Sequence, residues 1–206
     1  MSNRVDLTGI RARAVKELDY ALSLYNRAVK EKIDFKLIRY LGAMAAVDIH
    51  ATWERFTEDR LIAALHYDPT TFFRANEIRG IKRLPVGLAT ILVRERSIYF
   101  DFRSTDALID KADRLLGKSA NPFRKIPADD RGYLETLFKV RNCIGHRSKL
   151  AYSNYKSLIR KIYGIRSAPE PEEFLSAIDR RVNSPARNQS RLHGLIVVTR
   201  RTILHI

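Results

Sequence analysis

The sequence of 206 residues contains a single cysteine, Cys143, so no disulfide can form within the chain. This excludes the small extracellular folds that disulfide bonds hold together. Hydrophobic residues make up 45% of the chain, which is enough to bury a core without such bonds. One thiol without a partner suits the reducing cytosol, and we therefore expect a cytoplasmic protein.

Long hydrophobic runs are also missing. No run approaches the roughly 18 apolar residues that a membrane-spanning helix needs. The first residues, Met1–Asp6, lack the apolar segment of a secretion signal. Lipidation motifs and a basic tail are absent as well. We expect no association with a membrane.

Two kinds of ligand-binding motif are absent. The 5 histidines and the lone cysteine do not have the spacing of metal ligands, so a zinc site is not expected. The glycines Gly42, Gly80, Gly87 and Gly117 are isolated, so no glycine-rich loop is available to hold a phosphate. The sequence predicts neither a metal ion nor another cofactor.

Acidic residues are in short supply. The chain has 23 Asp and Glu against 38 Lys and Arg, which gives a net charge of +15. A basic surface alone can keep a protein soluble, but an excess of this size favours a polyanionic partner. Each phosphate that a cation neutralises releases condensed counterions. We interpret the charge as favouring nucleic acid, with another polyanion as the alternative.

The hydrophobic pattern at the start predicts two long helices. Apolar residues recur three or four positions apart from Leu7 to Val29 and again from Leu37 to Phe56. The first helix is expected over 5–32 and the second over 34–66, where Asp68 and Pro69 stop it. Because the break between them is short, they should pack as an antiparallel hairpin.

The rest of the chain also favours helices. We expect helices at 70–77, 86–95, 104–117, 129–147, 150–163, 172–183 and 192–203. A short extended segment is expected at 98–102 and a loop at 118–128, and Ser184-Pro185 should cap the last segment, although 195–199 also has strand propensity. Repeats and low-complexity linkers are absent. The prediction is a single all-α domain over 1–206, a helical bundle built on the two long antiparallel helices, a motif helix and C-terminal helices.

One stretch, Lys139–Ser148, combines residues suited to phosphate chemistry. Arg141 is a permanent cation that can hold a phosphate through two parallel hydrogen bonds. Asn142 follows it and can hydrogen-bond a substrate or His146. Histidine is the side chain that gains and loses a proton near neutral pH, so His146 is a candidate base or acid.

Helix geometry separates the two charged residues of this stretch. Positions five apart differ by about 140° around a helix, so Arg141 and His146 do not share one narrow face. Gly145 either loosens the helix before the histidine or permits close helix packing. The alternative interpretation of the stretch is purely structural: basic residues at a helix end stabilise the helix dipole, and a histidine caps its carbonyls.

Arg-polar-x3-His resembles the signature of the HEPN domains, helical proteins of which many are metal-independent endoribonucleases. Three further segments are similar to the RiboL-PSP-like branch of that family. They are Trp53-Glu54-x-Phe56-x-Glu58-Asp59, Tyr99–Ser104 and Asn121-Pro122-Phe123. The resemblance covers roughly residues 5–200 and is most specific at 131–148.

The resemblance implies a toxin or defence endoribonuclease that works as a homodimer, with two motif helices forming one cleft. Arg141, Asn142 and His146 would be catalytic, and Arg147 and Lys149 would bind flanking phosphates of the RNA. An antitoxin protein is a candidate further partner. The alternative function is a non-catalytic helical module that binds RNA or a partner protein.

Two residues of the second helix have alternative interpretations. Glu54 and Glu58 lie four apart on one face, where solvated charges are usual. Glu54 would otherwise act as a supporting carboxylate that orients Arg141 or His146 across the bundle. We predict that His50 lies on the helix surface or is partly buried, without a catalytic role.

The sequence departs from the family at one position. Some HEPN toxins have the pattern Arg-x4-His-x-Tyr, and a partner enzyme silences them by adding AMP to the tyrosine. Ser148 stands at that position here, and Tyr152 follows four residues later. Regulation by AMP addition is therefore not expected from the motif.

Overall fold

The computed structural model describes residues 5–95 and 97–206. Within these ranges the regular elements are helices, and β pairing is limited to one isolated bridge between Ile178 and Ser190. The all-α prediction is confirmed. The elements are α1 Leu7–Lys30, α2 Phe35–Tyr67, α3 Thr70–Ala75, α4 Val86–Val93, α5 Thr105–Leu116, the 3₁₀ turn η1 Pro122–Lys125, α6 Ala128–His146, α7 Lys149–Tyr163, α8 Pro171–Ser176 and α9 Arg191–His205.

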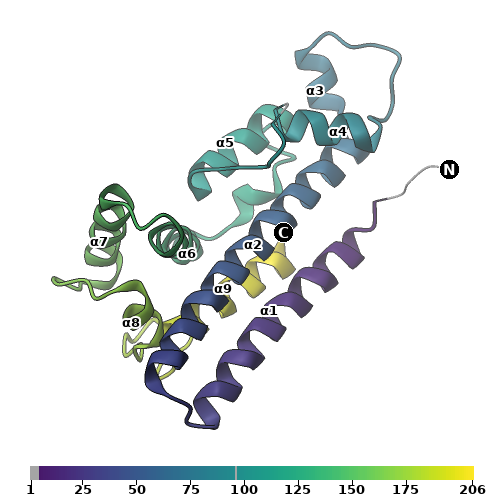
Figure 1. Cartoon of the computed structure of the whole chain (residues 1–206). Coiled ribbons are helices and arrows are strands. Elements are labelled where there is room, and N and C mark those ends of the chain that lie inside the picture. Colours follow the sequence, from purple (N-terminus) through teal and green to yellow (C-terminus); the bar gives the residue numbers. More distant parts are fainter. Residues whose placement is uncertain (1–4, 96) are drawn as a thin grey trace.

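Helices α1 and α2 form the predicted antiparallel hairpin (Figure 1). Glu17 accepts hydrogen bonds from Thr52 and Arg55 at 3.1 and 2.7 Å. Nearer the turn, Tyr25 packs over Gly42, where an added Cβ would lie 3.3 Å from the ring. Glycine thus permits the close approach of the two helices at that point. Each helix begins at an aspartate whose side chain accepts backbone N–H groups of its first turn.

The last helix, α9, packs against both members of the hairpin. Arg200 forms an ion pair with Asp19 at 3.4 Å, and His193 lies edge-on to Tyr25. The buried positions recur at helical spacing, and they are Leu192, Gly194, Leu195, Ile196, Val198, Thr199, Thr202 and Ile203. This periodicity outweighs the strand propensity of 195–199, and the prediction of a helix is confirmed.

Helix α2 runs through the centre of the hydrophobic core. Trp53 and Phe56 are both 2% exposed, and their rings stack with centroids 5.9 Å apart. Buried side chains connect from Ile10 near the start to Ile206 at the end in one continuous cluster. Helices α6 and α7 lie on one side of α2, and α1 lies on the other (Figure 1). This arrangement presents the end of α6 at the periphery.

The segment between α4 and α5 contains no strand in its described part, residues 94–95 and 97–104, in contrast to the extended segment predicted at 98–102. Phe100 and Phe102 are buried, and Phe102 stacks on Phe138 of α6, whereas Tyr99 is 77% exposed. The alternation of apolar and polar residues therefore reflects packing onto the core. The start of α5 is confirmed, since Ser104 Oγ accepts the N–H of Ala107.

Two boundaries near the C-terminus were predicted wrongly. Helix α8 ends at Ser176 instead of continuing to 183, because Ala177 is extended and Asp179 exchanges backbone hydrogen bonds with residues 188 and 189. The last helix begins after Ser190. Ser184-Pro185 does not cap it, and the Ser184 side chain instead accepts the N–H of Ala186 in a turn. Tertiary pairing of 177–190 overrides the local helical pattern there.

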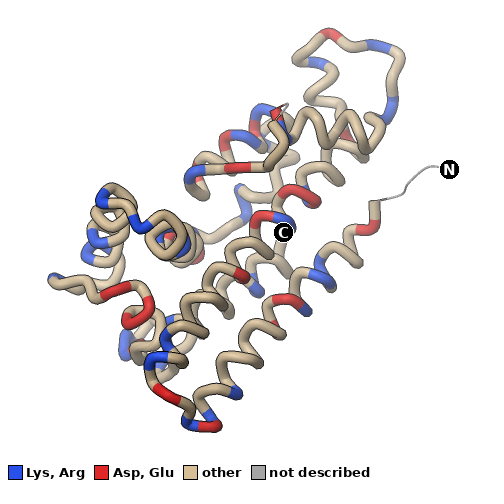
Figure 2. The backbone as a smooth tube through the Cα atoms, in the orientation of Figure 1, with Lys and Arg blue, Asp and Glu red and all other residues tan. Residues whose placement is uncertain are grey.

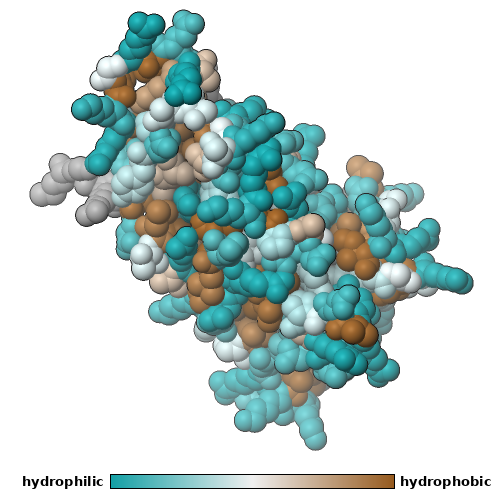
Figure 3. Space-filling view, turned by 180° about the vertical axis from the view of Figure 1, so that it is seen from behind, coloured by the Kyte–Doolittle hydropathy of each residue, from teal (hydrophilic) through white to brown (hydrophobic). Residues whose placement is uncertain are grey.

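Among the described residues, no helix is both long and apolar enough to cross a membrane. The rear face of the molecule shows hydrophobic side chains in separate areas divided by hydrophilic ones (Figure 3).

Candidate active site

Helix α6 holds the motif in its last turns and ends at His146. At its start Asp130 is buried and accepts hydrogen bonds from Arg201 of α9, which fixes that end of α6 to the core. The far end projects into solvent. From Gly145 to Leu150 each residue is exposed, so the motif lies on an accessible edge.

The chain leaves α6 through a tight turn at Arg147. This residue has the left-handed backbone conformation, with φ of 48°, and its N–H donates to the Cys143 carbonyl at 3.1 Å. Helix α7 begins two residues later, where Ser148 Oγ accepts the N–H of Ala151. Ser148 therefore has a capping role. A left-handed residue just after the last turn is a common way for a helix to end.

Arg141 and Asn142 are half-buried and form a pair. The Arg141 guanidinium donates a hydrogen bond to Asn142 Oδ1 at 3.0 Å. The predicted partners of Asn142 were a substrate or His146, and the structure instead places its carbonyl oxygen on the arginine. One guanidinium nitrogen is thereby held, and the remaining donors stay available to an anion.

His146 lies in the last turn of α6 and is exposed. At about 100° per residue, Gly145 and Asn142 lie between Arg141 and His146 around the helix. A Cβ built on Gly145 would meet no atom within 4 Å. Close packing within the protomer therefore does not require this glycine, and the face between the two charged residues is open.

Glu54 lies beside His50 on α2. Its Oε2 is 3.3 Å from His50 Nδ1, and its side chain is 24% exposed. The predicted contacts of Glu54 with Arg141 or His146 are not among the ion pairs within 4.0 Å that the described residues form. In the single protomer, Glu54 therefore contacts His50.

His50 is 1% exposed, so the prediction of a surface or partly buried residue was wrong. Phe138 of α6 covers its ring, with centroids 5.4 Å apart. Within the described part of the chain, neither ring nitrogen has an aligned hydrogen-bond partner, because the approach of Glu54 has an ion-pair distance without hydrogen-bond geometry. The pattern of α2 alone does not show that a second helix covers this position.

A pocket of about 450 Å³ opens beside the end of α6. Its floor is apolar, and its rim includes Arg147 and Lys149, the two predicted substrate-binding residues. Arg141 and His146 are not among its lining residues. Sequence reasoning missed two other charged members, Glu170 and Glu172, which it placed in a turn. The structure thus brings Arg147 and Lys149 together with two carboxylates.

The thiol of Cys143 forms part of that floor. Burial, together with the charges of Glu170 and Glu172, raises its pKa to about 11. A thiol with so high a pKa stays protonated at neutral pH and is a poor nucleophile. Cys143 therefore contributes apolar surface to the pocket.

Acidic residues are absent from the sequence between Glu135 and Glu170. Apart from His146, the ionic side chains of this segment are the cations Lys139, Arg141, Arg147, Lys149, Lys156, Arg160, Lys161 and Arg166. Of these, only Lys139 takes part in the ion pairs within 4.0 Å that the described residues make. Lys and Arg positions follow one another along α7 (Figure 2).

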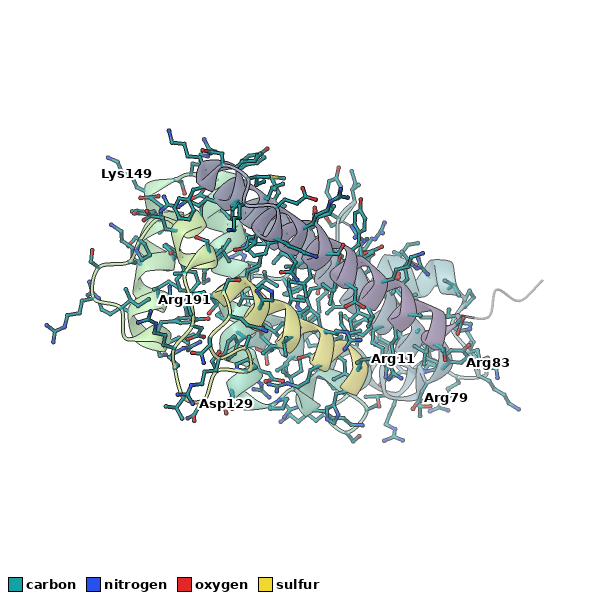
Figure 4. All side chains as sticks on the ribbon, turned by 90° about the horizontal axis from the view of Figure 1, so that it is seen from below. Arg11, Arg79, Arg83, Asp129, Lys149 and Arg191 are labelled. Carbon is teal, nitrogen blue, oxygen red and sulfur yellow. The ribbon has the colours of Figure 1, made fainter. Side chains whose placement is uncertain are left out.

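A second basic segment, which contains Arg79 and Arg83, lies far from the start of α7. Lys149 projects at one end of the molecule, whereas Arg79 and Arg83 project at the opposite end (Figure 4). Only the cations of α7 adjoin the motif helix.

In the described part of the chain, His, Cys, Asp and Glu side chains do not gather in groups of three or more that could hold a metal ion.

No protein-family model, curated protein or solved structure matches this chain.

Proposed function

We propose that the protein is a metal-independent endoribonuclease of the toxin or defence type. The observation that supports this most is the exposed end of α6, where Arg141, Asn142 and His146 lie within a segment that lacks acidic residues. Such a surface attracts an RNA backbone and offers both a proton-transfer group and a phosphate-binding group. The resemblance to HEPN proteins supports the same assignment, and we keep the cytoplasm as the expected location.

The proposed reaction uses the ribose 2′-hydroxyl of the substrate as the nucleophile. His146 removes its proton, the O2′–P bond forms, and the P–O5′ bond breaks. The departing 5′-oxygen then takes a proton from His146 in its protonated form. Arg141, held by Asn142, stabilises the charge that gathers on the phosphorane. The products are a 2′,3′-cyclic phosphate and a 5′-hydroxyl, and neither step requires a cofactor.

The same proposal includes a homodimer through α6. One protomer holds Arg141 and His146 about 140° apart, so a single helix does not direct both at one phosphate. A second copy of α6 against the open face at Gly145 would supply the missing group from the partner.

Substitution of Gly145 tests this interface. Gly145→Trp places a large ring in open space in the protomer, so we expect a normally folded protein. In a dimer packed through this face the ring would clash, and overpacking of about 1–3 kcal/mol raises the dissociation constant roughly 5- to 150-fold. Sedimentation equilibrium measures the constant, and circular dichroism verifies the fold.

Gly87→Trp is the matched control, because Gly87 is exposed on α4 and also has no atom within 4 Å of an added Cβ. It should leave association and cleavage unchanged. A wild-type protein that cleaves RNA as a monomer would refute the dimer.

RNA binding should weaken steeply with salt. For single strands, log K falls by about 0.7 per log unit of salt for each phosphate contacted. Replacing Lys156 and Arg160 of α7 by alanine should therefore reduce the slope by about 1.4. Fluorescence anisotropy over a salt series gives the slopes.

The control for this experiment is the double replacement of Arg79 and Arg83, which project at the opposite end of the molecule (Figure 4). Their loss should leave the slope unchanged. If both double replacements change the slope equally, α7 is not the RNA-binding surface. If the affinity of the wild type does not depend on salt, nucleic acid is not the partner.

The second candidate function is a non-catalytic module that binds a partner protein, such as an antitoxin. The hairpin favours it, because large apolar side chains are exposed there: Tyr20 at 65%, Phe35 at 58% and Tyr40 at 59%. If the protein is such a module, it should bind a partner protein and should not cleave RNA.

A further inference from the structure

The pocket beside the end of α6 has a mixed lining that the proposed reaction leaves unused. Cys143, Ile144 and Pro171 supply an apolar floor, Arg147 and Lys149 supply positive charge, and Glu170 and Glu172 supply negative charge. Its volume of about 450 Å³ falls in the range of small-molecule sites. A ligand that uses both kinds of charge needs hydrogen-bond donors for the carboxylates and acceptors for the cations.

One of the two carboxylates is held in place. Tyr152 donates its hydroxyl to Glu170 Oε1 at 2.6 Å, and this bond raises the pKa of Tyr152 to about 12. Lys156 lies over the Tyr152 ring, 4.2 Å from its centroid, and steadies it. The other oxygen of Glu170 and the carboxylate of Glu172 remain as acceptors at the pocket, because an ionised carboxylate accepts hydrogen bonds only.

We propose that this pocket binds a guanine base of the RNA. Guanine presents N1–H and the N2 amino group side by side, a pair of donors that matches the two oxygens of one carboxylate. The adjacent edge of guanine presents the acceptors O6 and N7, which an arginine or lysine recognises. Glu172 would bind the first edge with its two oxygens, the remaining oxygen of Glu170 would add a further acceptor, and Arg147 or Lys149 would bind the second edge.

The other bases fit this lining less well. Adenine and cytosine each place a ring-nitrogen acceptor next to the amino group, and uracil places its one N–H between two carbonyls. Each of these acceptors would face a carboxylate and repel it. The two carboxylates therefore select guanine by exclusion as well as by attraction.

Helix geometry assigns the guanine to a nucleotide that flanks the cut. Cys143 lies about 60° around α6 from His146, and Ile144 about 60° from Arg141. Both are on the side away from Asn142 and Gly145, so the pocket and the proposed reaction centre lie on opposite sides of the helix end. The strand would pass over the exposed turn at Arg147–Lys149. The recognised base is thus displaced from the scissile phosphate.

This inference rests on the proposed function for its RNA substrate, but the pocket can be tested without cleavage. Calorimetry with guanosine, adenosine, cytidine and uridine 5′-monophosphates should show guanosine monophosphate binding at least about tenfold tighter than the others. His146→Ala should bind the four nucleotides as the wild type does.

Glu170→Gln and Glu172→Gln should each reduce the preference, and the double variant should bring the four affinities within about twofold of one another. Glu173→Gln is the matched control, since Glu173 is the neighbouring acid of α8 but pairs with Arg39 at 2.7 Å and does not line the pocket. Equal binding of the four nucleotides, absence of binding, or a preference that survives in the double variant would overturn the proposal.

Cleavage of a mixed RNA pool separates the two proposals. Cuts at a fixed distance from guanine support both proposals, provided that the double variant of Glu170 and Glu172 loses this preference. Cuts without a guanine preference overturn the pocket assignment and leave the nuclease. Selective binding of guanosine monophosphate without cleavage supports the pocket and overturns the nuclease.

Discussion

His146→Ala should lower the rate of RNA cleavage by about 10²–10⁴-fold, because it removes the group that transfers protons in the proposed reaction. The fold should not change. His146 is exposed, and the Arg147 backbone, not the imidazole, hydrogen-bonds the Cys143 carbonyl at the helix end. Single-turnover cleavage of a defined RNA measures the effect, with circular dichroism to verify folding.

His205→Ala is the matched control. His205 is also exposed in the last turn of a helix, α9, and has no role in the proposed site. It should cleave at the wild-type rate. If His146→Ala folds and cleaves as fast as this control, the catalytic assignment of His146 is wrong. If it unfolds, His146 has the structural role of a helix cap.

Arg141→Ala should reduce cleavage by about 10²–10³-fold, by analogy with the loss of one donor that stabilises a developing oxyanion. The guanidinium is half-buried and donates to Asn142 at 3.0 Å, so it is oriented before the substrate arrives. The loss should appear mainly in the rate of the chemical step, because the phosphorane holds more charge than the ground state.

Arg141→Lys separates charge from geometry. It keeps the cation but lacks the planar fork of the guanidinium, so it should recover binding more than rate. A folded Arg141→Ala variant with wild-type rate and weakened binding would instead make Arg141 an electrostatic contact for the RNA backbone.

Most of the fold was predictable because its long helices have apolar residues at helical spacing and clear boundaries. Helices α1 and α2 show apolar spacing of three or four residues and end at residues that stop helices, such as Asp68-Pro69. The end of α8 was not predictable. Residues 177–183 continue a plausible local pattern, but backbone pairing of Asp179 with 188 and 189 places them in a loop.

Only those features of the candidate site that depend on a single segment of the chain were predictable. The exposed turn from Gly145 to Lys149 follows from the end of an amphipathic helix. Contacts between distant segments could not be predicted in this way. Phe138 of α6 covers His50, and Glu170 lines the same pocket as residues at the end of α6. Periodicity describes one face of one helix and gives no information on which element packs there.

The most direct test of the account compares one RNA oligonucleotide with its 2′-deoxy counterpart in the presence of EDTA. The account predicts that the protein cuts the RNA, leaves the deoxy strand intact, and yields a 2′,3′-cyclic phosphate and a 5′-hydroxyl, because the 2′-oxygen is the nucleophile. Mass spectrometry of the products distinguishes these ends from a 3′-hydroxyl and a 5′-phosphate. Equal cutting of both strands, loss of cutting in EDTA, or binding of the RNA without cleavage would contradict it.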